Sequence, residues 1–387
     1  MPRLLWLFCL VNLVIGSSAF VLGGILVPMA RDLAISVPTA GQAMTAYALS
    51  TALLAPVLLL ATGRWSRKRA LLLALLVFAA GNVLCALATS FTALLVGRVL
   101  MGLGAVFTPI AAGIAVAIVA PAQRGKALGF VFLGISLSYV IGVPLGAWLG
   151  LAYGWQLPIW LAVALCVLAM GAVALFVPAH LQSPGASFAG FGRLLARGDV
   201  LGVLATTLLY FVAIFAVFSY IGPVLQALSP MTGERLSLTL MLFGLSGVAG
   251  TLLGGMANDR FGSRRCMGVL LSVLGGSMLL LPLAAGSWLA VVAVLLVWGT
   301  AGFGMMVPQQ SRLSGLAPAH TPVLLSLNAS MLYLGTAGGA VIGGAAAGAL
   351  GFAHLSWAGA PFVAAALAVL WLGPTLQPSS TADPRTA

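Results

Sequence analysis

The chain is a series of long apolar runs separated by short polar segments. A helix that crosses a bilayer needs about 20 mainly apolar residues, and the runs match that length. The pattern therefore predicts an all-α membrane protein with twelve transmembrane helices in two six-helix halves. The expected helices cover about residues 4–29, 39–62, 70–88, 92–119, 127–153, 157–177, 200–222, 236–257, 266–286, 288–312, 322–350 and 355–375.

One long polar connection interrupts this pattern near the middle of the chain. Serine, proline, glycine and arginine replace the apolar residues there, which is typical of a linker. We therefore expect a first half at residues 1–178, a cytoplasmic linker at 179–199 and a second half at 200–376. Residues 377–387 are expected to form a cytoplasmic tail.

Composition excludes several classes of protein. Hydrophobic residues make up 62% of the chain and charged residues 6%, which a soluble globular protein could not hide from water. The net charge of +12 falls in short clusters between apolar runs rather than on one face, so nucleic acid is not an expected partner. The four cysteines are isolated, and we find neither a metal pair nor a nucleophile with a base. We expect no metal, no cofactor and no enzyme activity.

The basic residues also predict the orientation of the helices. Short loops rich in Lys and Arg stay on the cytoplasmic side. We therefore expect the protein in the inner membrane of a bacterial cell, with both termini in the cytoplasm. Residues 1–19 also fit a signal peptide, but an uncleaved first helix is favoured because the apolar run continues to about Ala30. Fourteen of the 17 basic residues then face the cytoplasm: Arg3, Arg64, Arg67, Lys68, Arg69, Arg124, Lys126, Arg193, Arg197, Arg260, Arg264, Arg265, Arg312 and Arg385.

Residues 255–265 place one acid and three arginines between two apolar runs, and we interpret them as a short loop. Residues 63–69 occupy the same place in the first half. The second-half segment, GGMANDRFGSRR, matches the pattern GxxxDRxGxR. The residues from Arg98 to Gly104 match RxxxGxG, and Gly134 followed by GVPLG at residues 142–146 completes a third motif.

Through these motifs the chain resembles the drug and sugar efflux branch of the major facilitator superfamily, which contains the arabinose-type exporters. The segments FSYIGPVL at 218–225 and SLNASMLYLGTAGGAVIGG at 326–344 resemble the same branch. The resemblance implies the major facilitator fold and proton-coupled export of a small organic molecule such as a drug or a sugar. It also implies a monomer that works with a small-molecule substrate, protons and membrane lipid.

The resemblance assigns a gate to the charged segments, in which Asp259 is the acid of an ion-pair latch. In the first half Gly63 stands where that acid belongs. We therefore expect one complete latch and one that has kept only its positive charges. The expected gate residues are Gly255, Asp259, Arg260, Gly262, Arg264, Arg265, Arg64, Arg67 and Lys68.

Arg98 is the charged residue expected deepest in the membrane, about six residues inside its helix. A charge at the bilayer centre costs about 2.5–3.5 kcal/mol or more, so Arg98 should face the protein interior or a wet cavity. Its candidate partners are Asn12, Gln42 and Tyr139, with Asp32 on the same side of the membrane. We interpret Arg98 and Asp32 as the coupling or cavity charges.

The glycines of the fifth helix have two interpretations. Gly134, Gly142 and Gly146, with Pro144, match the antiporter motif that the resemblance implies, whereas glycines at a spacing of four also simply permit close helix packing. Both interpretations stay open. For the corresponding glycines at 335–344 packing is favoured.

The expected substrate cavity is lined by polar or aromatic residues of the long helices, although each could equally serve packing. With few charges available, we expect a neutral, amphipathic or anionic substrate. No acid is expected in mid-membrane, which favours an uncoupled facilitator or an uptake permease as alternatives; a membrane sensor or enzyme is the alternative outside transport. The cavity candidates are Asn12, Ser18, Gln42, Tyr47, Tyr139, Tyr210, Gln309 and Asn328.

Overall fold

The computed structural model describes residues 3–120, 123–179, 194, 196–317 and 320–373. Within these residues the chain is helical without strands, and twelve helical segments are long and apolar enough to cross a membrane. The predicted fold class is confirmed. The helices are α1 (Arg3–Phe20), α2 (Leu22–Asp32), α3 (Val37–Ala61), α4 (Arg67–Ala86), α5 (Phe91–Gly104), α6 (Phe107–Ala117), α7 (Arg124–Leu137), η2 (Ser138–Gly142), α8 (Val143–Tyr153), α9 (Gln156–Phe176), α11 (Gly198–Phe218), α12 (Ile221–Leu228), α13 (Gly233–Phe261), α14 (Ser263–Leu280), η3 (Leu281–Ala284), α15 (Trp288–Gly304), α16 (Met306–Leu316), α17 (Thr321–Leu350), η5 (Phe352–His354) and α18 (Ser356–Leu372).

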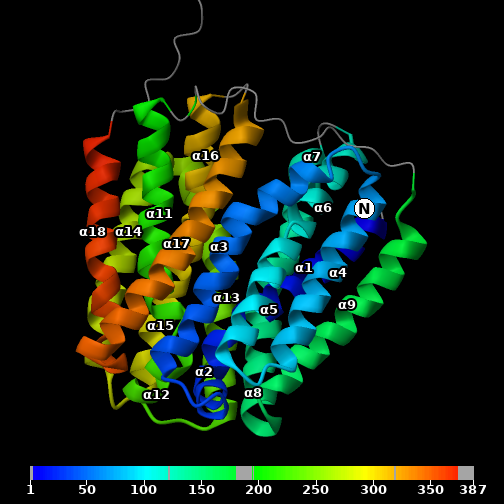
Figure 1. Cartoon of the computed structure of the whole chain (residues 1–387). Helices are drawn as coiled ribbons and strands as arrows, with labels where there is room; N and C mark the ends of the chain where they lie inside the picture. The colour runs from blue at the N-terminus through cyan, green and yellow to red at the C-terminus, as the bar shows by residue number, and fades with distance from the viewer. Residues whose placement is uncertain (1–2, 121–122, 180–193, 195, 318–319, 374–387) are drawn as a thin grey trace, which may run out of the picture.

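The helices form two groups that stand side by side (Figure 1). The N-terminal helices α1–α9 pack mainly on one another, and so do the C-terminal helices α11–α18. Contacts between the groups join α3 to α17, α8 to α13 and α2 to α12. We call the end of the bundle where α1 begins and α18 ends the terminal end, and the opposite end the distal end. The expected linker falls largely on residues 180–193 and 195, and the expected tail on 377–387, all outside the described residues.

Several of the membrane-spanning segments are interrupted near their middle. The first changes from α1 to α2 at Val21, whose backbone angles stay helical, so the chain continues in almost the same direction to Asp32. The seventh passes from α11 to α12 through Tyr220, whose backbone angles are not helical, and ends at Leu228. The predicted ends at Met29 and Gly222 were too early, because the helical segments continue to Asp32 and Leu228.

The charged segment at residues 255–265 is mostly helical, which corrects its interpretation as a loop. Helix α13 continues to Phe261 and α14 begins at Ser263. Gly262 alone separates them, with a φ of 80°, a left-handed conformation that glycine adopts without steric cost. The connection between α3 and α4 is longer, but there too the predicted loop overlaps a helix, since Arg67 already starts α4.

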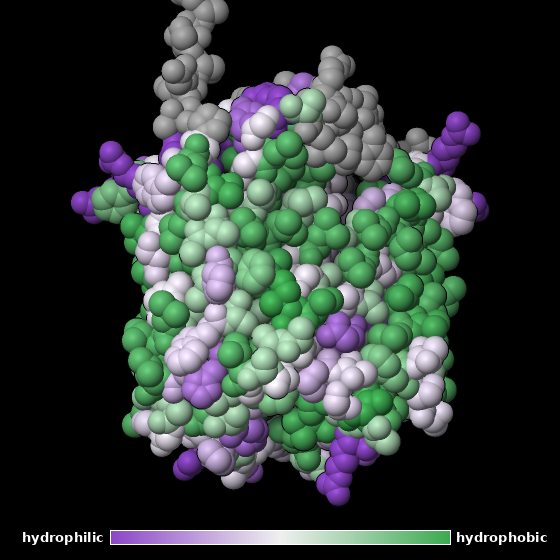
Figure 2. Space-filling model, turned by 60° about the vertical axis from the view of Figure 1, so that its left-hand side comes forward, coloured by the Kyte–Doolittle hydropathy of each residue, from purple (hydrophilic) through white to green (hydrophobic). Residues whose placement is uncertain are grey.

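The side of the bundle is apolar and its two ends are polar, as Figure 2 shows by colour. Leu168, Leu252 and Leu289 are among the large hydrophobic side chains that are exposed. An exposed apolar band of this extent is expected where hydrocarbon chains of lipid replace water. The surface therefore fits a protein whose sides face a membrane.

Candidate functional site

Aromatic side chains from both groups of helices meet near the middle of the bundle. Tyr139 of η2 stacks on Phe20 of the N-terminal helices at a centroid distance of 5.0 Å. On its other sides it contacts Phe303 at 5.1 Å and Phe218 at 5.6 Å, both from the C-terminal helices. Tyr139 is only partly buried. It thus occupies the boundary between the two groups, at mid-membrane, where part of its surface stays accessible.

The local backbone explains how Tyr139 reaches this place. Residues Ser138–Gly142 form a single π-helical turn between α7 and α8. Pro144 follows at the start of α8, and because proline has no backbone N–H it cannot donate the usual bond to the preceding turn. A widened π turn accommodates that loss, and such turns are frequent at functional sites.

Two further tyrosines lie at the same level. Tyr47 of α3 and Tyr333 of α17 make an edge contact at 6.4 Å across the two helix groups, the same boundary at which Tyr139 contacts Phe20 and Phe303. Tyr47 is buried and Tyr333 is partly exposed. The sequence prediction included Tyr47 and Tyr139 but missed Tyr333, whose only signal was a phenol within an apolar run. We call these three residues the tyrosine triad.

Arg98 lies next to Tyr47 of the triad and is 1% exposed. Its guanidinium donates hydrogen bonds to the backbone carbonyls of Ala19 at 2.8 Å, Ser18 at 3.2 Å and Ala43 at 3.2 Å. It also lies 4.9 Å from the centre of the Tyr47 ring. Ser18 and Ala19 belong to the last turn of α1, where carbonyl groups lack partners within the same helix.

The partners of Arg98 are thus backbone oxygens and a ring face. The side chains proposed as partners, those of Asn12, Gln42, Tyr139 and Asp32, do not accept from it. Sequence could not reveal this, because the break after α1 that presents the carbonyls has no residue signature. Arg98 clamps three helices and its charge is not directed at the space between the two helix groups.

Most of the other predicted cavity residues are engaged inside one helix group. Asn12 donates to the Val131 carbonyl at 3.0 Å and accepts from Thr108 at 2.6 Å. Ser18 donates to Asn82. The buried Tyr210 packs on Phe211 at 4.9 Å. These residues have the packing role that the sequence left open.

In the C-terminal helices a buried polar chain links α16, α11 and α17. Gln309 donates to the hydroxyl of Thr207 at 2.8 Å and to the Val203 carbonyl at 2.6 Å. Thr207 in turn donates to Asn328 at 2.6 Å, and Arg312 donates to Gln309 at 3.2 Å. The chain fixes three helices together, so Gln309 and Asn328 also serve packing.

Gln42 is placed at the distal closure of the molecule. Its amide donates to the Tyr220 hydroxyl at 3.2 Å and to the Ala340 carbonyl at 3.3 Å, which are both in the C-terminal helices. The Tyr220 hydroxyl also donates toward Ala340 at 2.9 Å and Pro38 at 3.2 Å. The bonds of Gln42 to Tyr220 and Ala340, and of Tyr220 to Pro38, cross between α3 and the C-terminal helices and hold the two groups together near the distal end.

A second crossing lies between α8 and α13. The Ser237 hydroxyl donates to the carbonyl of Pro144 at 2.8 Å. Close by, Gly244 of α13 lies so near the backbone of Tyr139 that a side chain there would collide with it. The α8 and α13 helices are therefore in backbone contact from the triad outward.

The glycines of the fifth-helix motif pack against the first helix. An added methyl group at Gly134 would collide with the carbonyl of Cys9, at Gly142 with Ser17, and at Gly146 with Val21. Close approach of backbones is the usual reason for small residues between membrane helices. The structure accounts for these glycines by packing, and a coupling role for the motif stays a prediction.

The gate residues lie at the terminal end. Asp259 is exposed, and its carboxylate accepts from Asn258 at 3.3 Å. Among the described residues it has no ion-pair partner within 4.0 Å. Arg264 donates instead to the backbone carbonyls of Trp371 at 2.9 Å and Gly373 at 3.1 Å. The latch is not formed in this conformation, and its role stays a prediction.

The acids of the described chain all lie at helix ends. Asp32 accepts from the indole of Trp155 at 2.8 Å at the distal end, Glu234 is in the first turn of α13, and Asp199 pairs with Arg197 at 2.7 Å. No cluster of His, Cys, Asp or Glu within the described residues could hold a metal ion. A mid-membrane carboxylate for binding protons is likewise absent from this part of the chain.

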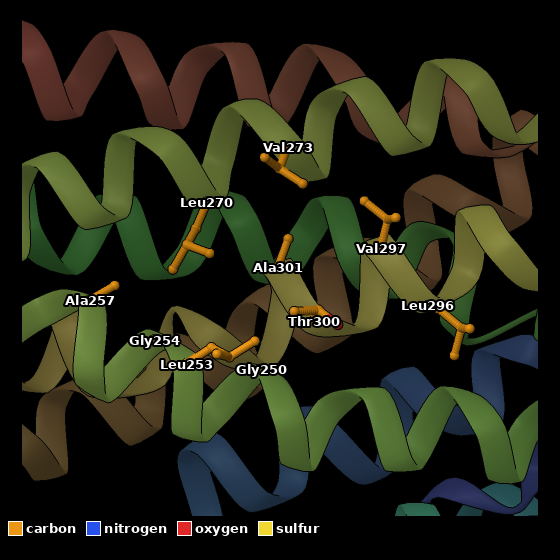
Figure 3. A pocket seen from close by; sticks show the side chains of 10 residues that line it. All are labelled: Gly250, Leu253, Gly254, Ala257, Leu270, Val273, Leu296, Val297, Thr300 and Ala301. Carbon is orange, nitrogen blue, oxygen red and sulfur yellow. The ribbon is translucent and has the colours of Figure 1, made fainter.

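An apolar groove lies outside the centre, between α13, α14 and α15 (Figure 3). It encloses about 420 Å³ and is lined by Gly250, Leu253, Gly254, Ala257, Leu270, Val273, Leu296, Val297, Thr300 and Ala301. Gly250 and Gly254 of α13 pack against the backbone of Thr300 and Gly304 of α15, and Leu253 and Val297 are exposed. With one hydroxyl in its lining, the groove offers little to a polar molecule.

Known proteins resemble this chain over nearly its whole length. The family model of the Major Facilitator Superfamily matches residues 8–337 and 231–387. The inner membrane transport protein YdhP of Escherichia coli K12 is 32% identical over 95% of this chain and 94% of its own. A probable sugar efflux transporter of Pasteurella multocida is 27% identical over 92% of this chain and 88% of its own.

Solved structures agree on the fold. The crystal structure of a bacterial homologue of the human lysosomal transporter Spinster, in an inward-facing and occupied conformation, superposes with a TM-score of 0.81 at 17% identity and covers 96% of each chain. At this identity the likeness concerns the fold alone. Together with the family match, it shows that the chain belongs to the major facilitator superfamily of membrane transporters.

Proposed function

We propose that this transporter exports a small neutral molecule that carries hydroxyl groups, such as a sugar, by alternating access. The observation that carries the proposal is the tyrosine triad: Tyr47 and Tyr333 make contact across the two helix groups, and Tyr139 contacts aromatic rings of both groups in the middle of its span. Phenols offer an apolar ring and a hydroxyl on the same side chain. The name of the Pasteurella relative, which refers to sugar efflux, supports the same substrate class.

Neutral substrates fit the site better than anions do. Arg98 is the only basic residue near the triad among the described residues, and its guanidinium is already bonded to three carbonyls and covered by Tyr47. A buried charge with all its bonding positions directed at the protein offers little to a ligand. The anionic alternative therefore loses its support.

The conformation supports alternating access. Gln42, Tyr220 and Ser237 carry hydrogen bonds between the helix groups on the distal side of the triad. At the terminal end the latch acid Asp259 is unpaired. We propose that the terminal end faces the cytoplasm and that this conformation is closed on the distal, outer side.

Transport in everted membrane vesicles tests the proposal. Vesicles that contain the protein should accumulate a neutral sugar or a related polyol, and Tyr139→Phe should weaken its apparent affinity about 2- to 10-fold, the value of one hydrogen bond. Tyr153→Phe is the matched control, since Tyr153 is 67% exposed at the end of α8. Accumulation of organic cations alone would refute the proposal.

Coupling to protons is a separate question with two candidates. The resemblance to antiporters implies exchange for protons, whereas the location of every described acid at a helix end favours an uncoupled facilitator. Proteoliposomes loaded with a pH-sensitive dye distinguish the two. A substrate gradient that changes the internal pH establishes exchange, and transport without a pH change establishes the facilitator.

We further propose that the chain works as a monomer in the lipid bilayer. The support is the resemblance to the major facilitator superfamily, whose fold commonly works as a monomer. Crosslinking of the reconstituted protein, followed by transport measurements on the monomer fraction, tests this. An inactive monomer beside an active dimer would overturn it.

A further inference from the structure

Two arginines at the terminal end lie close together without an acid. Arg264 begins α14, and its guanidinium donates through Nη2 to the carbonyls of Trp371 and Gly373 at the end of α18. It also lies 5.5 Å from the centre of the Trp371 ring. Arg312 belongs to α16, and its Nη1 donates to Gln309. Helices α14 and α16 pack against each other, so the two guanidinium groups belong to neighbouring helices at the same end of the bundle.

Several nitrogen atoms of these arginines are buried without an acceptor. They are Nε and Nη1 of Arg264 and Nε of Arg312, and Arg312 as a residue is only 7% exposed. A buried donor without a partner costs about 1–3 kcal/mol, and more when the group is charged. Two like charges with three idle donors are therefore an arrangement that an added acceptor would stabilise strongly.

The described chain supplies no acid to fill this need. Asp199 is paired with Arg197, and Asp32 and Glu234 belong to the distal end. Asp259 shares the terminal end, but it is exposed and has no basic nitrogen within 4.0 Å among the described residues. Because no acid among the described residues fills this need, we infer that a ligand supplies the acceptor.

We propose that Arg264 and Arg312 form a binding site for a phosphate-type anion between α14, α16 and α18. Guanidinium groups match the oxygen geometry of phosphate with paired, charge-assisted hydrogen bonds. Both arginines lie within one or two turns of a helix end, since α14 begins at Ser263 and α16 ends at Leu316. This level is where lipid headgroups lie, and a soluble phosphate could also reach it from water.

The surroundings strengthen the field at the site. Arg260 and Arg265 are exposed on the same end of the bundle, and basic clusters beside a membrane attract anionic lipids with about 1 kcal/mol for each charge near the surface. The site is distinct from the tyrosine triad, which lies at mid-membrane. Its occupancy does not depend on which molecule is transported.

Ligand binding to the purified full-length protein tests the proposal. Native mass spectrometry should retain phosphatidylglycerol on the wild-type protein and not phosphatidylcholine, and thermal unfolding should shift upward with the retained lipid. The double variant Arg264→Gln/Arg312→Gln should bind at least about tenfold more weakly, since it loses charge-assisted hydrogen bonds. Arg235→Gln is the control, because it removes an exposed charge at the opposite, distal end of the bundle and should bind nearly as the wild type does.

Inorganic phosphate separates the two sources of the ligand. The site is assigned to a soluble phosphate group if millimolar phosphate displaces the lipid. The same assignment follows if phosphate alone stabilises the wild-type protein but not the double variant. Lipid binding that phosphate does not displace assigns it to a headgroup. If the double variant does not fold, the thermal stability of the wild-type protein with each ligand is the test. A wild-type protein that neither ligand stabilises refutes the proposal. A folded double variant that binds the lipid as well as the wild type does also refutes it.

Discussion

Replacement of Arg98 by methionine should destabilise the protein, because three buried backbone carbonyls lose their donor, at about 1–3 kcal/mol for each acceptor left unpaired. Three hydrogen bonds from its guanidinium, at 2.8, 3.2 and 3.2 Å, join α5 to α1 and α3. At about 1.5–3 kcal/mol for each bond to a charged group, their sum is an upper limit. Burial of the guanidinium offsets several kcal/mol of it.

Thermal and denaturant unfolding of the purified variants in detergent measures this loss. Arg98→Lys should fall between the wild type and Arg98→Met, because one ammonium group cannot reach carbonyls of two helices in the same geometry. Arg235→Met is the matched control: Arg235 is exposed, and its contact is with the ring of Trp288 at 5.8 Å. An Arg98→Met protein as stable as the wild type would refute the clamp.

Three shorter predictions concern packing, closure and the latch. Gly134→Ala should impair folding, measured by the yield of monodisperse protein, because its methyl group would collide with the Cys9 carbonyl; Gly129→Ala, with open space around it, should not. Tyr220→Phe loses its bonds to Ala340 and Pro38, worth about 1 kcal/mol each, and spin labels at the distal ends of the two helix groups should move apart in a larger fraction of molecules. Asp259→Asn should slow transport without lowering thermal stability, because the carboxylate is exposed. An unchanged transport rate at equal expression would refute the proposed role of Asp259 in a latch.

The sequence predicted the number and approximate place of the membrane spans, but it did not predict the changes of helix geometry within them. Runs of apolar residues fix the number and approximate place of the helices because the bilayer requires a minimum length. The change from α1 to α2 at Val21 and the π turn at Ser138–Gly142 escaped prediction. Neither changes the hydropathy of the run in which it lies, and Pro144 marks the place of the π turn without specifying its geometry.

The candidate site shows the same division. Tyr47 and Tyr139 could be selected as polar aromatics within apolar runs, but their meeting with Tyr333 depends on how α3, η2 and α17 cross. The depth of Arg98 could be predicted from its position in a helix, while its partners could not, because they are backbone carbonyls. Polarity within a membrane run thus identifies residues that need a partner and does not say which partner they find.

The two ends of the molecule differ in the chemistry available for closing them. At the distal end, Gln42, Tyr220 and Ser237 hold the helix groups together through neutral hydrogen bonds, several of them to backbone carbonyls. Bonds of this kind contribute about 0.5–1.5 kcal/mol each, so the closure is worth a few kcal/mol. Alternating access requires the opposite conformation to be populated as well, and it must recover a similar free energy at the terminal end. The exposed, unpaired Asp259 is the acid available there among the described residues, and an ion pair formed only when that end closes would supply stabilisation of the required order.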